Sequence, residues 1–316
     1  MNYSGNTPMV DITYKYNGRI AHVYSKLEYY NPSGSIKDRV ASYIIDNATA
    51  RGELKAGQPI VETTSGNTGI AVAAYGAMTK HPVHIFMPDW ASQERVQLMK
   101  MYGANVHLVS KEDNGFLGAL DQTEQLAKEI GAFKINQFGN KDNMLAHYNS
   151  TSVEILEKLP DATDFISGVG SGGTIMGIGT RLAEANKSRI IAIEPDCNQI
   201  LAGKKATRQH KIEGIGDDFI PKILNKNIID QIIPINDDDA IAMSAKIARE
   251  LGLGVGISSG ANFLGAVIAN TNDNQKIATV FSDSNKKYLS TTLSASPDAS
   301  ANMLTSQIEL LDVKMI

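Results

Sequence analysis

The sequence predicts an α/β fold in two domains with mostly parallel, twisted sheets, and two observations carry this prediction. Short runs rich in β-branched residues alternate with helical patterns along most of the chain. That alternation is typical of parallel sheets covered by helices on both faces. Glycine-rich loops stand at two strand-to-helix junctions, residues 63–69 and 168–174. Two such loops indicate two sheets that each present one loop to a shared ligand cleft.

The predicted elements follow one another in strand–helix order. Most helical patterns have a capping residue in front or a glycine behind, which marks where a helix begins or ends. The expected strands are residues 59–62, 83–88, 105–109, 164–169, 189–195 and 276–282, and the clearest helices start at Ile70, Ser92, Asp121, Thr174 and Asp238. From about Thr291 the chain is rich in Ser and Ala, so the pattern leaves open whether residues 291–316 are ordered.

Composition narrows the range of ligands. The 316 residues are 42% hydrophobic, enough for a proper core, and the formal net charge is -4. The chain therefore lacks the basic footprint of a nucleic-acid or anionic-membrane protein. No apolar run reaches the ~18 residues of a membrane span. We expect small neutral or zwitterionic ligands, with no nucleic-acid or membrane partner.

A single cysteine, Cys197, restricts the chemistry further. An intramolecular disulfide is impossible, and a cysteine-built zinc site would need ligands that the sequence lacks. We therefore expect a cytoplasmic protein without a bound metal.

The loop GVGSGGT, residues 168–174, is suited to bind an anion. It follows a strand and opens a helix, so its backbone amides and the helix dipole favour a phosphate group. Gly168, Gly170 and Gly173 also match the GxGxxG dinucleotide fingerprint, and Glu194 closes the next strand about 20 residues later, where an acid would bind the ribose. An NAD-dependent oxidoreductase is therefore an alternative, and simple tight packing of the loop is another.

Two further motifs are ambiguous on their own. TTSGNTG, residues 63–69, is dense in hydroxyls and N–H groups that can bind a carboxylate, although Ser and Thr at such junctions are usually caps. In NPSGSIKDR, Lys37 stands at the start of an expected helix. By spacing alone Lys37 is a solvated surface lysine, because the charged Asp38 and Arg39 adjoin it.

Taken together, NPSGSIKDR, TSGNTGI and GVGSGGT resemble the cysteine synthase (O-acetylserine sulfhydrylase) and cystathionine β-synthase family of fold-type II pyridoxal-phosphate (PLP) enzymes. The motifs occur in the same order and at similar separations, and the similarity extends from about Gly5 to about Thr291. The resemblance implies a homodimer whose cofactor cleft lies between two domains. The implied domains are a large PLP-binding one of residues 1–36 and 147–290, a small mobile one of residues 37–146, and a C-terminal tail of residues 291–316.

The resemblance also assigns roles to individual residues. Lys37 corresponds to the lysine that forms an imine with PLP and later removes the α-proton of the substrate. Asn67 corresponds to the partner of the PLP hydroxyl, and Ser284 to the hydroxyl that hydrogen-bonds the pyridine nitrogen. The phosphate loop corresponds to Gly170, Ser171, Gly172, Gly173 and Thr174, and the contacts to the substrate carboxylate correspond to Thr64, Ser65, Gly66, Thr68 and Gln137.

The implied activity is β-replacement, in which sulfide and O-acetylserine, or a similar activated serine, give L-cysteine through an aminoacrylate. The segment KIEGIGDDFIP departs from the family at Asp217, where cysteine synthases carry a small residue and cystathionine-forming relatives an aromatic one. A carboxylate there could deprotonate water or a thiol. Cysteine breakdown to serine and hydrogen sulfide, or thiol condensation, is therefore the alternative, and a solvated loop acid is the plainer interpretation. The leaving group, the acceptor and binding of a serine acetyltransferase stay open.

GISSG, residues 256–260, matches the nucleophile elbow of serine hydrolases. The triad of that fold needs a histidine after the serine, and all six histidines precede Ser258. We expect Ser258 and Ser259 to cap a helix that begins near Ala261.

Overall fold

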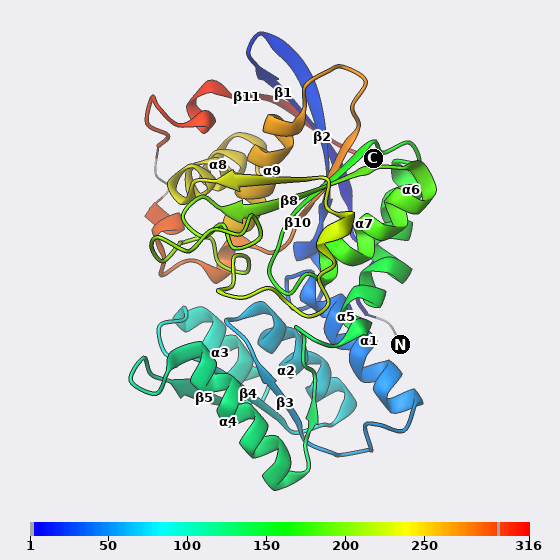
Figure 1. Ribbon diagram of the computed structural model, residues 1–316, viewed down its shortest axis with the longest axis vertical. Helices are drawn as coiled ribbons and strands as arrows, with labels where there is room; N and C mark the ends of the chain where they lie inside the picture. Colours follow the sequence, from blue (N-terminus) through cyan, green and yellow to red (C-terminus); the bar gives the residue numbers. More distant parts are fainter. Residues whose placement is uncertain (1–2, 296–297) are drawn as a thin grey trace.

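The computed structural model describes residues 3–295 and 298–316, and its strands form two sheets. The four-stranded sheet has the order β5 (Asn105–Val109), β4 (Val83–Pro88), β3 (Ile60–Thr63), β6 (Phe133–Lys134). The seven-stranded sheet has the order β11 (Glu309–Met315), β1 (Met9–Tyr16), β2 (Arg19–Leu27), β10 (Ile277–Phe281), β7 (Asp164–Gly168), β8 (Arg189–Pro195), β9 (Gln231–Ile235). The sheets lie in separate halves of the molecule, the seven-stranded one at the top of Figure 1.

The α/β class with mostly parallel sheets is confirmed. All pairs in the four-stranded sheet are parallel, and so are those that join β2, β10, β7, β8 and β9. The exceptions are β2 and β11, which both run antiparallel to β1. The sequence did not predict the β1–β2 hairpin, whose turn is made by Asn17 and Gly18, both with positive φ. Two residues of that conformation match the right-handed twist of the strands they join.

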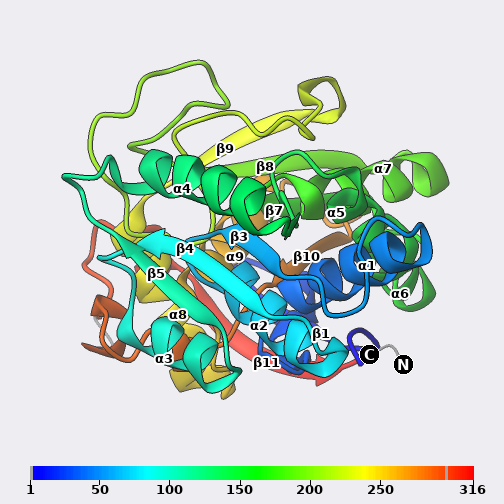
Figure 2. The same cartoon turned by 90° about the horizontal axis from the view of Figure 1, so that it is seen from below.

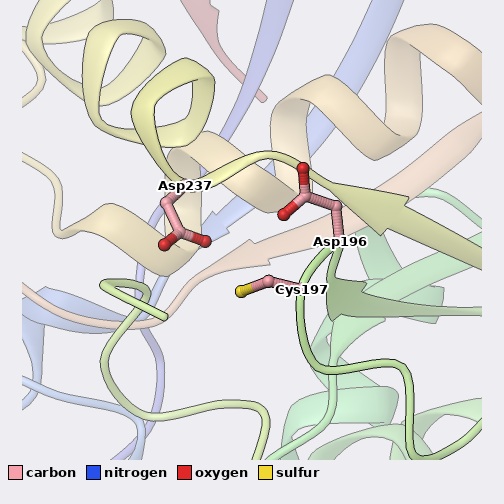
Figure 3. A group of neighbouring side chains, drawn as sticks. All are labelled: Asp196, Cys197 and Asp237. Atoms are coloured by element: carbon pink, nitrogen blue, oxygen red, sulfur yellow. The ribbon is translucent and has the colours of Figure 1, made fainter. Parts of the chain in front are cut away.

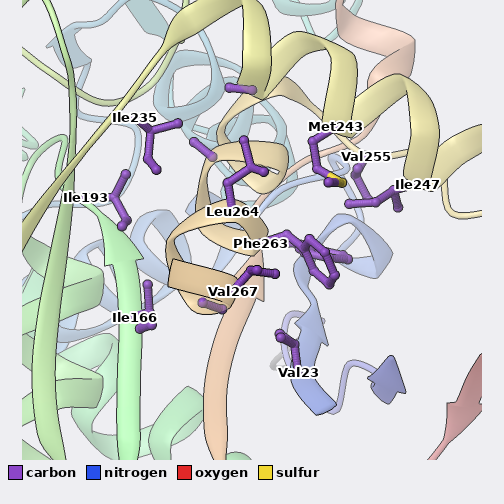
Figure 4. Close-up of a cluster of buried hydrophobic side chains, with 14 of the residues drawn as sticks. Val23, Ile166, Ile193, Ile235, Met243, Ile247, Val255, Phe263, Leu264 and Val267 are labelled. Atoms are coloured by element: carbon purple, nitrogen blue, oxygen red, sulfur yellow. The ribbon is translucent and has the colours of Figure 1, made fainter. Parts of the chain in front are cut away.

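Helices cover both faces of the seven-stranded sheet. Side chains alternate between faces along a strand, so Phe165 of β7 packs in the cluster that includes α7 (Gly173–Asn186) and α6 (Ser152–Lys158). Its neighbour Ile166 packs in the opposite cluster with α8 (Asp237–Leu251) and α9 (Ile257–Ala269). Figure 4 shows Ile166 and Ile193 facing Leu264 and Val267 of α9. Because both faces are buried, β7, β8 and β10 are nearly continuous apolar runs.

The four-stranded sheet has its own apolar core. One face packs against α1 (Lys37–Ala50), α2 (Asn67–Thr79) and α3 (Gln93–Met101), and the other against α4 (Gly115–Ile130). Figure 2 shows α4 on one side of β3 and β4, with α2 and α3 on the other. The chain returns to the larger sheet through α5 (Lys141–Ala146) and a π-helical segment, His147–Thr151. Short 3-10 helices span Glu28–Tyr30, Lys226–Ile228, Asn285–Lys287, Thr292–Ala295 and Leu304–Gln307.

Every strand and helix that the sequence predicts is formed, but three helices begin at least three residues earlier than predicted, among them α2, which begins at Asn67 rather than Ile70. α4 begins at Gly115 rather than Asp121, and α9 begins at Ile257 rather than near Ala261. The tail is also ordered over residues 309–315, which form the edge strand β11, whereas residues 296–297 lie outside the described residues. Within the described part of the chain, no helix is both long and apolar enough to cross a bilayer.

Candidate active site

One cavity collects most of the residues that the motifs single out. It is lined by loops at the carboxyl ends of β3 and β7, where ligands bind in open α/β sheets. Among the residues that line it are Lys37, Thr64, Ser65, Gly66, Asn67, Thr68, Gln137, Gly170, Ser171, Gly172, Thr174 and Asp217. Of the residues that the sequence assigned to the site, Gly173 and Ser284 do not line this cavity.

Lys37 is the first residue of α1, and its surroundings are buried rather than solvated. The carboxylate of Asp38 accepts hydrogen bonds from the backbone N–H and the hydroxyl of Ser33, at 3.0 and 2.8 Å. Arg39 is only 2% exposed, so the interpretation of this segment as surface is wrong. Burial lowers the pKa of the Lys37 amine, although Asp217 and Asp283 oppose that shift. A lowered pKa favours the neutral amine, which is the nucleophilic form.

The loop before α7 has the shape of a phosphate cradle. The helix begins at Gly173, so its first backbone N–H groups lack intrahelical partners and can bind an anion. A Cβ on Gly170 would overlap the carbonyl oxygen of Gly214, and one on Gly173 would overlap the side chain of Asn143. Gly172 has a φ of +87°, which side chains rarely adopt. These close approaches fit a phosphate ester such as that of PLP.

A buried histidine stands beside this loop. The Nε2 atom of His147 lies 3.4 Å from the hydroxyl of Thr174. Burial, together with Lys37 and Arg39, holds the pKa of His147 well below its usual range. A neutral imidazole can exchange a hydrogen bond with Thr174 without adding charge to the cradle.

The loop after β3 offers hydroxyls and N–H groups at the start of α2. The hydroxyl of Thr68 donates to Oε1 of Gln137 at 2.7 Å, and Nε2 of Gln137 donates to the carbonyl of Thr63 at 3.1 Å. Ser65 is exposed to the cavity. Behind the loop, the carboxylate of Glu62 accepts from the backbone N–H of Thr63 at 2.6 Å, and burial raises its pKa to about 7.

Ser284 lies away from the cavity. Its hydroxyl accepts from the backbone N–H of Lys286 at 3.2 Å and caps the 3-10 helix that starts at Asn285. The role that the resemblance implies for Ser284 stays a prediction, since in this structure the side chain caps that helix and does not line the cavity. Ser258, in the first turn of α9, lines the cavity instead and is 5% exposed. The sequence had assigned Ser258 only a capping role.

Asn67 is held on both sides. Its Nδ2 donates to Asp283 at 2.7 Å, and its Oδ1 accepts from the Lys287 amine at 2.8 Å. Neither partner was singled out from the sequence. The two contacts fix the plane of the amide, and Asn67 remains part of the cavity wall.

Arg95 is a cavity residue that the sequence did not reveal. It belongs to α3, is 2% exposed, forms an ion pair with Glu213 and lies 4.7 Å from the ring centre of Tyr288. Arg95 and Glu213 both line the cavity. Their ion pair therefore connects α3, which packs on the four-stranded sheet, to the segment that follows β8 of the seven-stranded sheet. No local signal distinguishes Arg95 from a surface arginine, because its partners are far away in the sequence.

Asp217 lines this cavity and also a second, wider one that opens beside it. Burial raises the pKa of its carboxyl to about 6, although His210 and Lys37 oppose the shift. At neutral pH the group is therefore mostly ionised but more basic than an ordinary aspartate, which suits a general base. The interpretation of Asp217 as a solvated loop acid does not fit this placement.

Glu194 does not serve the dinucleotide alternative. It is 1% exposed, its Oε2 accepts from the backbone N–H of Leu201 at 2.9 Å, and it is not among the cavity residues. An acid that must bind a ribose would have to reach the ligand. The GxGxxG match therefore gives no support to a dinucleotide ligand.

Comparisons with known proteins agree with this geometry. The family model "Pyridoxal-phosphate dependent enzyme" matches residues 1–283. Cysteine synthase of Staphylococcus aureus is 39% identical over 294 residues, which cover 92% of this chain and 94% of that protein. A hydrogen sulfide-producing enzyme from Fusobacterium nucleatum has a TM-score of 0.94 at 42% identity, covering 100% and 97% of the two chains. Cysteine synthase of Entamoeba histolytica has a TM-score of 0.87 at 37% identity, covering 96% and 92%.

Proposed function

The chain belongs to the family of pyridoxal-phosphate-dependent enzymes, and we propose that it exchanges the thiol of cysteine for water, giving serine and hydrogen sulfide. Its relatives include cysteine synthases and a hydrogen sulfide-producing enzyme, so chemistry at the β-carbon of a cysteine-like amino acid is common to them. We propose water as the second substrate because the carboxylate of Asp217 lies in the cavity and its pKa is raised to about 6.

The residues of the cavity fit PLP. We propose that Lys37 binds its carbonyl carbon, the 170–174 loop its phosphate, Asn67 its hydroxyl and Ser258 its ring nitrogen. Bound in this way, PLP withdraws electrons from the amino acid, so that the α-proton and then the β-substituent can leave. Ser258→Ala should therefore change the visible absorption of the bound cofactor, whereas Ser284→Ala should not.

Lys37 and Asp217 would divide the proton transfers between them. The neutral amine of Lys37 accepts the α-proton and passes it to the departing sulfur, as the C–S bond breaks. Asp217 then accepts a proton from water, whose oxygen forms the new C–O bond, and this proton returns through the Lys37 amine to the α-carbon. Serine and hydrogen sulfide are the balanced products of cysteine and water. The hydroxyl and N–H groups of residues 64–68, together with Gln137, would hold the carboxylate of the amino acid in place.

Asp217→Asn tests this proposal. Sulfide release from cysteine should fall about a hundredfold, because a positioned base typically contributes that much. In the unaltered enzyme the rate should rise as the pH passes through about 6, and this rise should be absent from the variant. Asp218→Asn is the matched control, since Asp218 is exposed and contacts Asn198 at 3.1 Å. An unchanged rate and pH profile in Asp217→Asn would rule out the role of this carboxylate.

Synthesis of cysteine from sulfide and O-acetylserine, or a similar activated serine, is the second candidate. It is favoured by the relatives named cysteine synthase, at 39% and 37% identity. The same purified enzyme should be given cysteine alone and then O-acetylserine with sulfide, and cysteine, serine and sulfide should be measured. Faster net formation of cysteine than of serine would favour this candidate. If only an added thiol were consumed, the product would instead be a thioether.

We also propose a division of the chain into two domains and an oligomeric state. The separate apolar cores of the two sheets support a large domain of residues 1–36 and 147–290 and a small domain of residues 37–146 that can move. We also propose a cytoplasmic homodimer. Sedimentation equilibrium of the purified protein tests the dimer, and a monomeric mass would contradict it.

A further inference from the structure

Three potential metal ligands meet at the carboxyl ends of two neighbouring strands, outside the active site. Asp196 and Cys197 directly follow β8, and Asp237 begins α8 soon after β9. The strands are parallel, with Pro195 paired to Ile235, so the residues that follow them arrive side by side. One ligand atom from each residue lies within 4.8 Å of the others. Figure 3 shows the sulfur of Cys197 pointing toward the carboxylate of Asp237, with the Asp196 carboxylate beside them.

The carboxylate of Asp237 is buried with one oxygen unused. The residue is 0% exposed, and its Oδ2 accepts from Arg208 at 2.7 Å and from the backbone N–H of Lys211 at 2.8 Å. Its Oδ1 has no hydrogen-bond partner among the described residues. Oδ1 of Asp196 also lacks a hydrogen bond there, with only an ion pair to Arg208 at 3.5 Å. A buried carboxylate oxygen without a partner is destabilising, so these two atoms call for a further ligand.

The donor set and its charge suit a divalent cation that binds sulfur. A thiolate and carboxylate oxygens are ordinary ligands of Zn²⁺, with water completing the tetrahedron. Two carboxylates and a metal-bound thiolate carry three negative charges, and Arg208 supplies one positive charge. A divalent cation would neutralise the two negative charges that remain. The sequence predicted no metal site because it has one cysteine; the fold supplies the carboxylates that a cysteine pattern cannot show.

We propose that Asp196, Cys197 and Asp237 form a binding site for a thiophilic divalent cation such as Zn²⁺. None of the three lines either cavity. The exposed Arg208 side chain is paired with both carboxylates, at 3.5 Å from Asp196 and 2.7 Å from Asp237. This inference does not depend on the direction of the reaction.

The site is joined to the wider cavity beside the candidate active site. The backbone N–H of Thr207 donates to the carbonyl of Cys197 at 2.8 Å, and Asp237 holds Arg208 and Lys211. Residues 206–211 line the wider cavity, which they share with Asp217. A cation bound at Oδ1 of Asp237 would therefore weaken the hold of this carboxylate on Arg208 and Lys211 and loosen one wall of the wider cavity.

Titration of the purified holoenzyme with Cd²⁺ tests the site directly. Cadmium bound to a thiolate gives an ultraviolet charge-transfer band, and Cys197 is the only cysteine in the sequence. We expect the band to saturate at one equivalent. Absence of the band from the unaltered enzyme would overturn the proposal, whatever the variants show.

Variants identify the other ligands and the background. Cys197→Ser should abolish the band, and Asp237→Asn should weaken cadmium binding at least tenfold. Asp238→Asn is the matched control, because Asp238 is an exposed neighbour paired with Lys211 at 2.8 Å. His84 and His107, whose ring nitrogens lie 3.3 Å apart, could also bind metal, and His84→Ala should leave the band unchanged. Unchanged cadmium affinity in Asp237→Asn would overturn the proposed site. If Asp237→Asn does not fold, the same measurement is made on Asp196→Asn, and unchanged affinity there would overturn the site as well.

Discussion

The two strand-to-helix loops of the active site look alike in sequence but are constrained in different ways. Each follows a parallel strand and opens a helix, α2 after Gly66 and α7 after Gly172. In the 170–173 loop, the space beside Gly170 is closed by the backbone carbonyl of Gly214. In the 64–67 loop, the space beside Gly66 is closed by a side chain, that of Arg95, rather than by backbone. One loop is therefore fixed by backbone, and the other can adjust.

This difference matches the two tasks that we propose. A phosphate that stays bound through every turnover needs an unchanging cradle, whereas a carboxylate that enters and leaves needs a loop that can close over it. Asn143 and Gln137 connect the two loops: Nδ2 of Asn143 donates to the Gln137 carbonyl at 2.8 Å and to the Ser171 hydroxyl at 2.9 Å, and the Thr68 hydroxyl donates to Gln137 at 2.7 Å. A shift of one loop can therefore be transmitted to the other through these hydrogen bonds.

The largest effect is expected from Gly170→Ala. The new methyl group has to displace the backbone around Gly214, so affinity for PLP should fall more than a hundredfold, and overpacking should lower stability by about 1–3 kcal/mol. Cofactor absorbance after dialysis and thermal unfolding measure the two effects. Gly66→Ala is the comparison: it should keep the cofactor and weaken only amino-acid binding. Equal loss of cofactor in both variants would contradict the claim that only the 170–173 loop is fixed by backbone.

A smaller effect is expected from the pH dependence of Glu62, which lies behind the adjustable loop. Its pKa is raised from 4.5 to about 7 in the folded protein, so the folded state holds the proton more tightly than the unfolded state. Stability should therefore fall as the pH rises from about 4.5 to 7, on the order of 3 kcal/mol.

Glu62→Gln removes this titration. Thermal unfolding from pH 5 to pH 8 should show a smaller loss of stability in the variant than in the unaltered protein. Asp217 titrates in the same sense, with its pKa raised to about 6, so the comparison between the two proteins isolates Glu62. Parallel pH profiles would show that Glu62 is not a buried acid of raised pKa.

Thr68→Val should have the smallest effect. It removes the hydrogen bond to Gln137 while preserving shape, and the apparent affinity for the amino acid should fall about tenfold, equivalent to about 1.4 kcal/mol. Cofactor content should not change. Steady-state kinetics should show the loss in KM more than in kcat, and a loss of cofactor would instead place Thr68 in the phosphate cradle.

What the sequence could predict depended on whether the signal was local. β8 reads RIIAIEP because both of its faces are buried, and its bounds were predicted correctly. Arg95 was invisible because Glu213 and Tyr288 reach it only in the folded chain. Ser258 was missed as a cavity residue for a related reason: motif alignment gives the order of residues, while the path of the folded chain decides which hydroxyl lines the cavity. Cys197 and Asp237 likewise meet only through the pairing of β8 with β9.

The antiparallel pairing of β1 with β11 affects how the chain acquires its fold. Val10 pairs with Met315, so the outer edge of β1 is covered by a strand that is synthesised about 300 residues later. Until then β1 presents unpaired N–H and C=O groups, and such an edge can recruit strands from other chains. Contacts between distant parts of a chain also form slowly. Chains that lack residues 309–315, either because they are truncated or because synthesis is not finished, should therefore be the most prone to aggregate.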